Sequence, residues 1–135
     1  MVSNRGKPEG QQAVTVAIFI VLAGLMGAGG IILAAAGAHV APGAGLDSAA
    51  TMLLVHAAAV LGGTALLLHG VMWRPLLVII LAAWLIGAAL FSGDIALRAF
   101  AGHRLFVMAA PSGGTILIAA WLVLAGAGIC ALLRR

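Results

Sequence analysis

Charged side chains are scarce in this sequence, since Lys and Arg contribute only 7 of its 135 residues and Asp and Glu only 3. A soluble domain carries about 25% charged residues, because water must wet its surface. Apolar residues make up 64% of the chain, and a surface so poor in charge needs lipid over much of its area. The composition therefore indicates an integral membrane protein.

Other absences exclude whole classes of function. The net charge is +4, but the basic residues stand singly or in pairs near the ends of apolar runs, without interleaved aromatics. This pattern excludes nucleic acid as a partner. The single cysteine, Cys130, cannot form an internal disulfide and lies near the end of an apolar run, which favours a packing role over a redox role. No Ser-His-Asp arrangement, phosphate loop or carboxylate pair is recognisable, so we expect neither enzymatic activity nor a cofactor.

Four apolar runs follow a polar segment at residues 1–12, which we interpret as a flexible cytoplasmic tail. About 20 apolar residues cross a hydrocarbon core of about 30 Å, and the first run is longer than the apolar core of a signal peptide, about 7–15 residues. The sequence therefore predicts an all-α integral membrane protein whose single domain, residues 13–135, is a compact bundle of four transmembrane helices. The predicted spans are residues 13–37, 48–71, 75–92 and 112–133.

The stretch between the third and fourth spans has a mixed character. Ser92, Gly93 and Asp94 are turn-forming residues and predict the end of the third span. Residues 94–108 then combine basic and apolar side chains, which predicts a short interfacial helix. Pro111, with Gly113 and Gly114 behind it, predicts the turn that starts the fourth span.

Basic residues also predict the orientation. If the N-terminus is cytoplasmic, the outer side holds only Arg98 and Arg104, and the inner side holds five basic residues: Arg5, Lys7, Arg74, Arg134 and Arg135. Cytoplasmic loops carry an excess of Lys and Arg. We therefore predict that both termini are cytoplasmic.

Small residues predict how the helices pack. Lipid tails are as apolar as leucine, so helices in a bilayer associate through close contact between small side chains. In the first span such residues recur in steps of three and four and therefore form one stripe; the predicted packing residues here and in the next two spans are Gly27, Gly30, Ala34, Gly63 and Gly87. These stripes suggest self-association or membership of a larger membrane complex.

His56 is the polar residue of greatest interest, because it lies about 10 Å inside the second span on the face that carries Gly63. An ionisable group at that depth is costly and suggests a function. Two interpretations stay open: a neutral histidine hydrogen-bonded to a neighbouring helix, or a role in ligand, metal or proton handling. Haem is disfavoured, because His56 and His69 are 13 residues apart, about 140° around the helix.

A polar pocket at the outer side is the second candidate site. His39 ends the first span and Asp94 follows the third, so both could approach His56 there; with Ser92 they form the candidate pocket. Imidazole and carboxylate groups suit zinc, copper or iron. No short His-x-x-x-His or Cys-x-x-Cys spacing is present, so the identity of any metal is unknown.

Three stretches in order resemble one protein family: Ala-Gly-Ala-His at residues 36–39, Leu-Phe-Ser-Gly at 90–93, and Pro-Ser-Gly-Gly at 111–114 leading to Trp121. His56 falls where that family has an aromatic-His-Ala step. The chain thus resembles the uncharacterised bacterial membrane proteins of the YgdD/YwdK type, the domain-of-unknown-function family 423. The resemblance implies a four-helix protein of the bacterial inner (plasma) membrane and no established activity.

These observations lead to two functional hypotheses. The first is a non-enzymatic structural or accessory membrane protein that self-associates or joins a larger complex. The alternative is a protein that handles a small ligand or metal in a periplasm-facing polar pocket around His39, His56 and Asp94.

Overall fold

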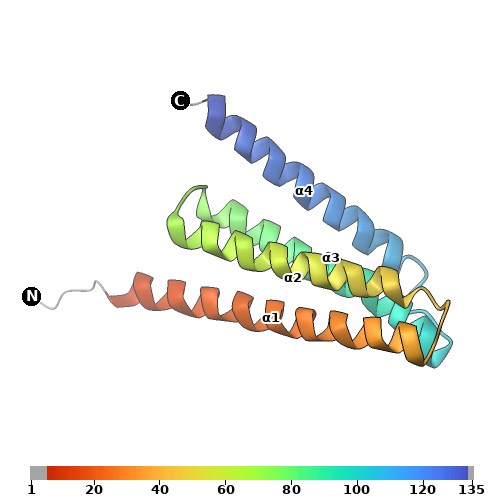
Figure 1. Cartoon of the computed structure of the whole chain (residues 1–135). Helices are drawn as coiled ribbons and strands as arrows, with labels where there is room; N and C mark the ends of the chain where they lie inside the picture. The colour runs from red at the N-terminus through yellow and green to blue at the C-terminus, as the bar shows by residue number, and fades with distance from the viewer. Residues whose placement is uncertain (1–5, 134–135) are drawn as a thin grey trace, which may run out of the picture.

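The computed structural model describes residues 6–133, which form four α-helices joined by short connections (Figure 1). Helix α1 spans Gly6–His39, α2 spans Leu46–His69, α3 spans Arg74–Ala101 and α4 spans Ala109–Leu133. Each of the four is long and apolar enough to cross a membrane. The predicted all-α, four-helix membrane fold is confirmed.

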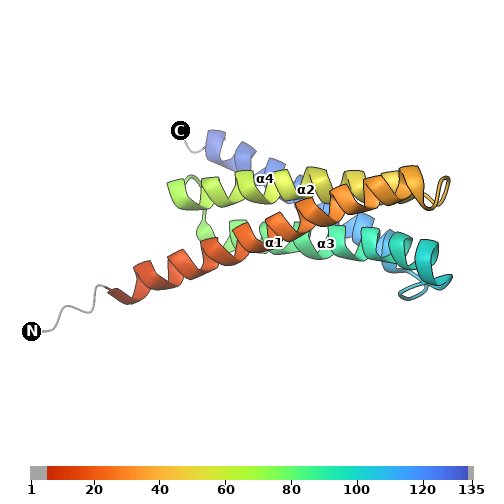
Figure 2. The same cartoon turned by 60° about the horizontal axis from the view of Figure 1, so that its bottom comes forward.

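The helices form a chain of neighbours. Helix α1 packs along α2, α2 along α3, and α3 along α4, with a smaller contact between α1 and α3. Figure 2 shows α1 running obliquely across α2 and α3. Among the described residues, no Cα atom of α4 lies within 8 Å of one in α1 or α2. The backbone of α4 therefore packs closely only along α3.

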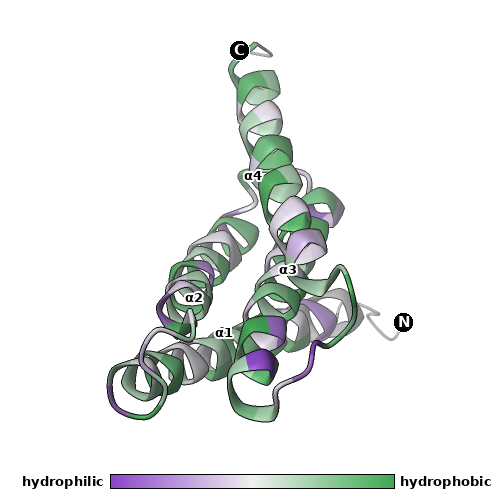
Figure 3. Cartoon of the chain, turned by 90° about the vertical axis from the view of Figure 1, so that its right-hand side faces the viewer, coloured by the Kyte–Doolittle hydropathy of each residue, from purple (hydrophilic) through white to green (hydrophobic). Residues whose placement is uncertain are grey.

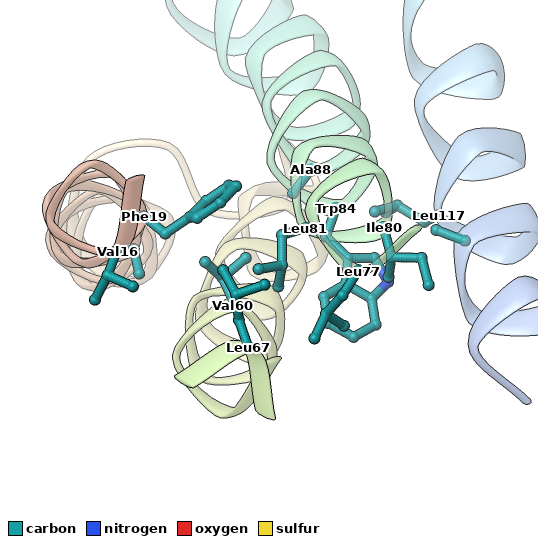
Figure 4. Packing of buried hydrophobic residues seen from close by; sticks show 12 residues of the cluster. Val16, Phe19, Val60, Leu67, Leu77, Ile80, Leu81, Trp84, Ala88 and Leu117 are labelled. Carbon is teal, nitrogen blue, oxygen red and sulfur yellow. The ribbon is translucent and has the colours of Figure 1, made fainter. Parts of the chain in front are cut away.

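Apolar side chains fill the interior and also cover the outside. The buried cluster joins all four helices, with Phe19, Val60, Trp84 and Leu117 among its members (Figure 4). Large apolar residues such as Leu122, 68% exposed, cover the outer surface. Figure 3 shows hydrophobic residues along the helices and hydrophilic ones at the end of α3 and along its connection to α4. Such a surface requires lipid, and the chain is a multi-pass membrane protein.

The end of the third helix differs from the sequence prediction. Ser92, Gly93 and Asp94 do not form a turn, because α3 continues through them to Ala101. The predicted interfacial helix over residues 94–108 is wrong: its first part belongs to α3, and residues 102–108 form an irregular connection. The actual end is at Gly102, whose φ of 73° is left-handed and whose N–H bonds to the Arg98 carbonyl.

All four helices begin earlier than predicted, and the difference is largest for α1 and α4. Helix α1 begins at Gly6, so residues 6–12, expected within the tail, are helical, and the rest of that tail lies outside the described residues. Helix α4 begins at Ala109, so Pro111 lies in its first turn, where proline costs no hydrogen bond. Gly113 and Gly114 are consequently inside the helix and not in a turn.

Candidate functional site

His56 is buried in the middle of α2, with 4% of its surface exposed. Its Nδ1 atom lies 2.9 Å from the carbonyl oxygen of Met52, and the indole Nε1 of Trp121 lies 3.2 Å from its Nε2. An indole N–H can only donate, so Nε2 accepts this bond and Nδ1 carries the proton that is donated to Met52. The ring is therefore a neutral histidine with both nitrogens satisfied. This geometry corresponds to the first interpretation above, a histidine bonded to a neighbouring helix.

Two tryptophans complete an aromatic cluster, which we define as His56, Trp84 and Trp121. The ring centroids of Trp84 and Trp121 are 4.4 Å apart, and His56 lies 6.4 Å from Trp84 and 6.2 Å from Trp121. The cluster thus ties α2, α3 and α4 together at one level of the bundle. The Nε1 atom of Trp84 is buried and has no hydrogen-bond partner within residues 6–133, an arrangement that costs about 1–3 kcal/mol.

Asp94 organises a second polar site near the end of α3. Only 3% of this residue is exposed. Its Oδ1 accepts a 3.0 Å bond from the backbone N–H of Leu105, and its Oδ2 lies 3.1 Å from an Arg98 guanidinium nitrogen. The carboxylate therefore fastens the α3–α4 connection to α3. The Arg98 side chain, in contrast, is 41% exposed.

The four residues of the predicted pocket have separate surroundings. Ser92 donates a 2.9 Å bond to the Ala49 carbonyl of α2, while His56 and Asp94 bond to the partners described above. His39 is exposed at the end of α1. Within residues 6–133, no three His, Cys, Asp or Glu side chains are grouped to hold a metal ion. Ser92, His56 and Asp94 thus each have a structural partner, and the four residues do not converge on one centre.

The glycine stripe of α1 faces α2 of the same chain. A Cβ added at Gly30 would lie 2.7 Å from the Leu54 side chain, and one at Gly27 would lie 3.9 Å from Ala57. Ala34, on the same helix, is half-buried. Small residues here allow close approach of two helices. This stripe is used within the chain and is not free for a second molecule.

Gly87 and Gly113 bring α3 and α4 into close contact. A Cβ added at Gly113 would lie 2.6 Å from the Gly87 carbonyl oxygen and 2.6 Å from the Phe91 backbone nitrogen. In the same way, a Cβ added at Gly63 of α2 would collide with the side chain of Leu81. Sequence reasoning assigned Gly113 to a helix start, whereas its position against α3 gives a stronger reason for glycine.

The family described as "Protein of unknown function (DUF423)" matches residues 33–114, more than half of the chain. This chain belongs to the DUF423 family. The matched region contains His56, Ser92 and Asp94 and ends before Trp121. No curated protein and no solved structure matches the chain.

Grooves flank α4 in this DUF423 protein. One, of about 510 Å³, opens between its C-terminal half and the start of α3, with Trp73, Leu76 and Cys130 in its walls. Two others, of about 450 and 410 Å³, lie nearer its N-terminal half and contain Asp94 and His56 respectively. Helix α4 thus has unfilled surface along both its N-terminal and its C-terminal half.

Proposed function

We propose that this chain is a non-enzymatic structural or accessory protein of the bacterial inner membrane, which assembles with copies of itself or with a larger membrane complex. The observation that carries this proposal is the poor coverage of α4. Only 11% of its most apolar stretch is buried, against 39% for α3. A partner helix is the natural cover for such a face.

The exposed half of α4 has the residues that helix association uses. A Cβ added at Gly126 or Gly128 would meet nothing within 4 Å, and Ala127 and Cys130 line the 510 Å³ groove beside α3. Helices in lipid associate by bringing backbones close at small residues. Because the stripe of α1 already contacts α2, we place the partner on α4.

The buried polar side chains support a non-enzymatic role. A catalytic acid or base needs a proton or lone pair that is available to the substrate. His56 uses both ring nitrogens, and each carboxylate oxygen of Asp94 has a partner. We do not adopt the alternative of a shared ligand pocket, because His39, His56 and Asp94 have separate surroundings.

We further propose that both termini are cytoplasmic. The start of α1, the end of α4 and the α2–α3 turn lie at one end of the bundle (Figure 1). The sequence segments that flank this end of the helices contain five basic residues, and the α3–α4 region at the opposite end contains two. This distribution agrees with the excess of Lys and Arg in cytoplasmic loops. A C-terminal fusion that is fluorescent in the cytoplasm would support this orientation, and one active only as a periplasmic reporter would reverse it.

Cys130 offers a direct test of assembly, because it is the single cysteine, is exposed, and lines the proposed face. Oxidative cross-linking in native membranes is expected to join it to a second copy or to another membrane protein. Gly126→Leu, one turn away on the same face, should reduce that product strongly. Gly24→Leu on α1 is the matched control, since a Cβ there also meets nothing within 4 Å. A chain that stays monomeric and co-purifies with no protein would contradict the proposal.

A further inference from the structure

The two grooves beside the N-terminal half of α4 adjoin each other. The 450 Å³ groove at the α3–α4 connection and the 410 Å³ groove between α2 and α4 share Phe91, Gly114 and Ile118 in their walls. We call the two together the α4 groove. Its mouth lies at the α3–α4 connection, and its lower part reaches the aromatic cluster and covers about 12 Å of α4 between Gly114 and Leu122.

Positive charge surrounds the mouth of the α4 groove. Arg98 and Arg104 line it, and Asp94 is the one acidic residue in the same wall. Asp94 already bonds to Arg98 and to the Leu105 N–H, while Arg104 makes a 3.3 Å bond to the Val107 carbonyl. Each guanidinium thus retains N–H groups without a protein partner among the described residues. The mouth is cationic and can accept an anion.

The deeper part of the α4 groove is apolar. Met52, Leu117 and Leu122 line it together with Ile118. The polar atoms of His56 and Trp121 at its end bond to each other and to Met52. No free hydrogen-bonding side chain is therefore presented to an occupant there, and the walls suit a hydrocarbon chain.

From this arrangement we propose that the α4 groove binds one phospholipid of the leaflet at this end. Its phosphate contacts Arg98 and Arg104, and one acyl chain lies along α4 toward the aromatic cluster. Guanidinium groups pair well with phosphate, and basic residues near the membrane surface attract anionic lipids by about 1 kcal/mol each. An anionic headgroup is consequently preferred over a zwitterionic one. This site is separate from the face proposed for assembly.

The size of the lower groove suits an acyl chain. The available volume is about 410 Å³. A single hydrocarbon chain fits this space without moving α4 away from α3.

Native mass spectrometry of the detergent-purified full chain tests the proposal. The probes are phosphatidylglycerol, phosphatidylcholine and inorganic phosphate, each titrated separately. We expect one tightly bound phosphatidylglycerol, weaker phosphatidylcholine and no retained phosphate ion. Arg104→Gln should lower the affinity for phosphatidylglycerol about fivefold, from the loss of one surface cation. Arg74→Gln, at the other end of α3, should leave it unchanged.

A second variant tests the apolar part without touching the charges. Gly114→Leu places a side chain in the groove, where a Cβ would be 3.9 Å from the Phe91 ring and clash with nothing. It should displace the lipid, whereas Gly62→Leu on α2, also in open space, should not. Equal lipid retention by Gly114→Leu and Gly62→Leu would overturn the proposal. So would a bound second copy in place of lipid, or phosphate binding that matches that of the lipid.

Discussion

The two ends of the α3–α4 pair differ in how closely the helices approach. Near the α3–α4 connection, Gly87 and Gly113 bring the two backbones together, and an added Cβ has no room. Toward the C-terminus α4 diverges from α3 (Figure 1), and a groove of about 510 Å³ separates them. At that open end, a Cβ added at Gly126 or Gly128 would meet nothing within 4 Å. Glycines in α4 therefore have different surroundings: Gly113 allows close packing against α3, whereas Gly126 and Gly128 lie on an unoccupied surface.

Gly113→Leu should produce the largest effect, because it lies at the end of the α3–α4 pair where the two helices are in close contact, which we call the closed end. Its Cβ would lie 2.6 Å from backbone atoms of Gly87 and Phe91, which cannot rotate away. Overpacking of this kind costs about 1–3 kcal/mol or more, so we expect a loss of about 3 kcal/mol in the free energy of unfolding in detergent. Gly114→Ala is the control and should change it by less than about 0.5 kcal/mol. Equal losses in both variants would mean that the glycine contact does not hold α4.

Asp94→Ala should have the next largest effect, since Asp94 fastens the connection at the same closed end. The substitution leaves the Leu105 N–H without its acceptor and removes the partner of Arg98. A hydrogen bond to a charged group contributes about 1.5–3 kcal/mol. Hydrogen exchange of the Leu105 amide should accelerate in Asp94→Ala and much less in Asp94→Asn, which keeps an oxygen acceptor. Unchanged protection in the alanine variant would show that the carboxylate does not order the connection.

Trp121→Phe removes the hydrogen bond that links α4 to α2 midway between the two ends. The indole N–H no longer reaches His56 Nε2, while the ring stacking on Trp84 largely remains. Interhelical hydrogen bonds in membranes are worth about 0.6 kcal/mol on average and about 1.7 kcal/mol at most. A double-mutant cycle with His56→Ala should return a coupling energy in this range. His56→Asn, which can also accept from Trp121, should lose less stability than His56→Ala.

Gly128→Ala should have the smallest effect, because it lies at the open end. A Cβ there meets nothing within 4 Å, and surface substitutions usually change stability by less than about 0.5 kcal/mol. Thermal unfolding of the purified chain in detergent should therefore match that of the unsubstituted protein. A marked loss of stability would indicate that this face is covered in the purified protein, for example by a second copy.

The number and type of helices were predictable because each span is a long apolar run. The end of α3 was not, because serine, glycine and aspartate form turns readily where water can solvate the backbone. In this bundle Ser92 bonds to Ala49 of α2, and Asp94 bonds to Leu105 and Arg98. Because these polar side chains have hydrogen-bond partners while the helix stays intact, α3 continues through them.

The site was predictable only in part. The depth of His56 and its position on a face with Gly63 indicated that it would meet another helix. Its partner, Trp121, lies 65 residues away in sequence, and nothing in local spacing connects the two. The close contact of Gly87 with Gly113 could not be predicted for the same reason, because the two glycines belong to different helices and are far apart in sequence. Pairings between distant helices need the tertiary arrangement.

The contacts of α4 also set the mechanical behaviour of its C-terminal part. Beyond Trp121, its member of the aromatic cluster, α4 continues for about 18 Å to Leu133. A rotation of about 10° around that point would move the far end by about 3 Å, while the Trp121–His56 bond and the Gly87–Gly113 contact would shift little. The last three turns of α4 can therefore tilt toward or away from α3 without disturbing the aromatic cluster.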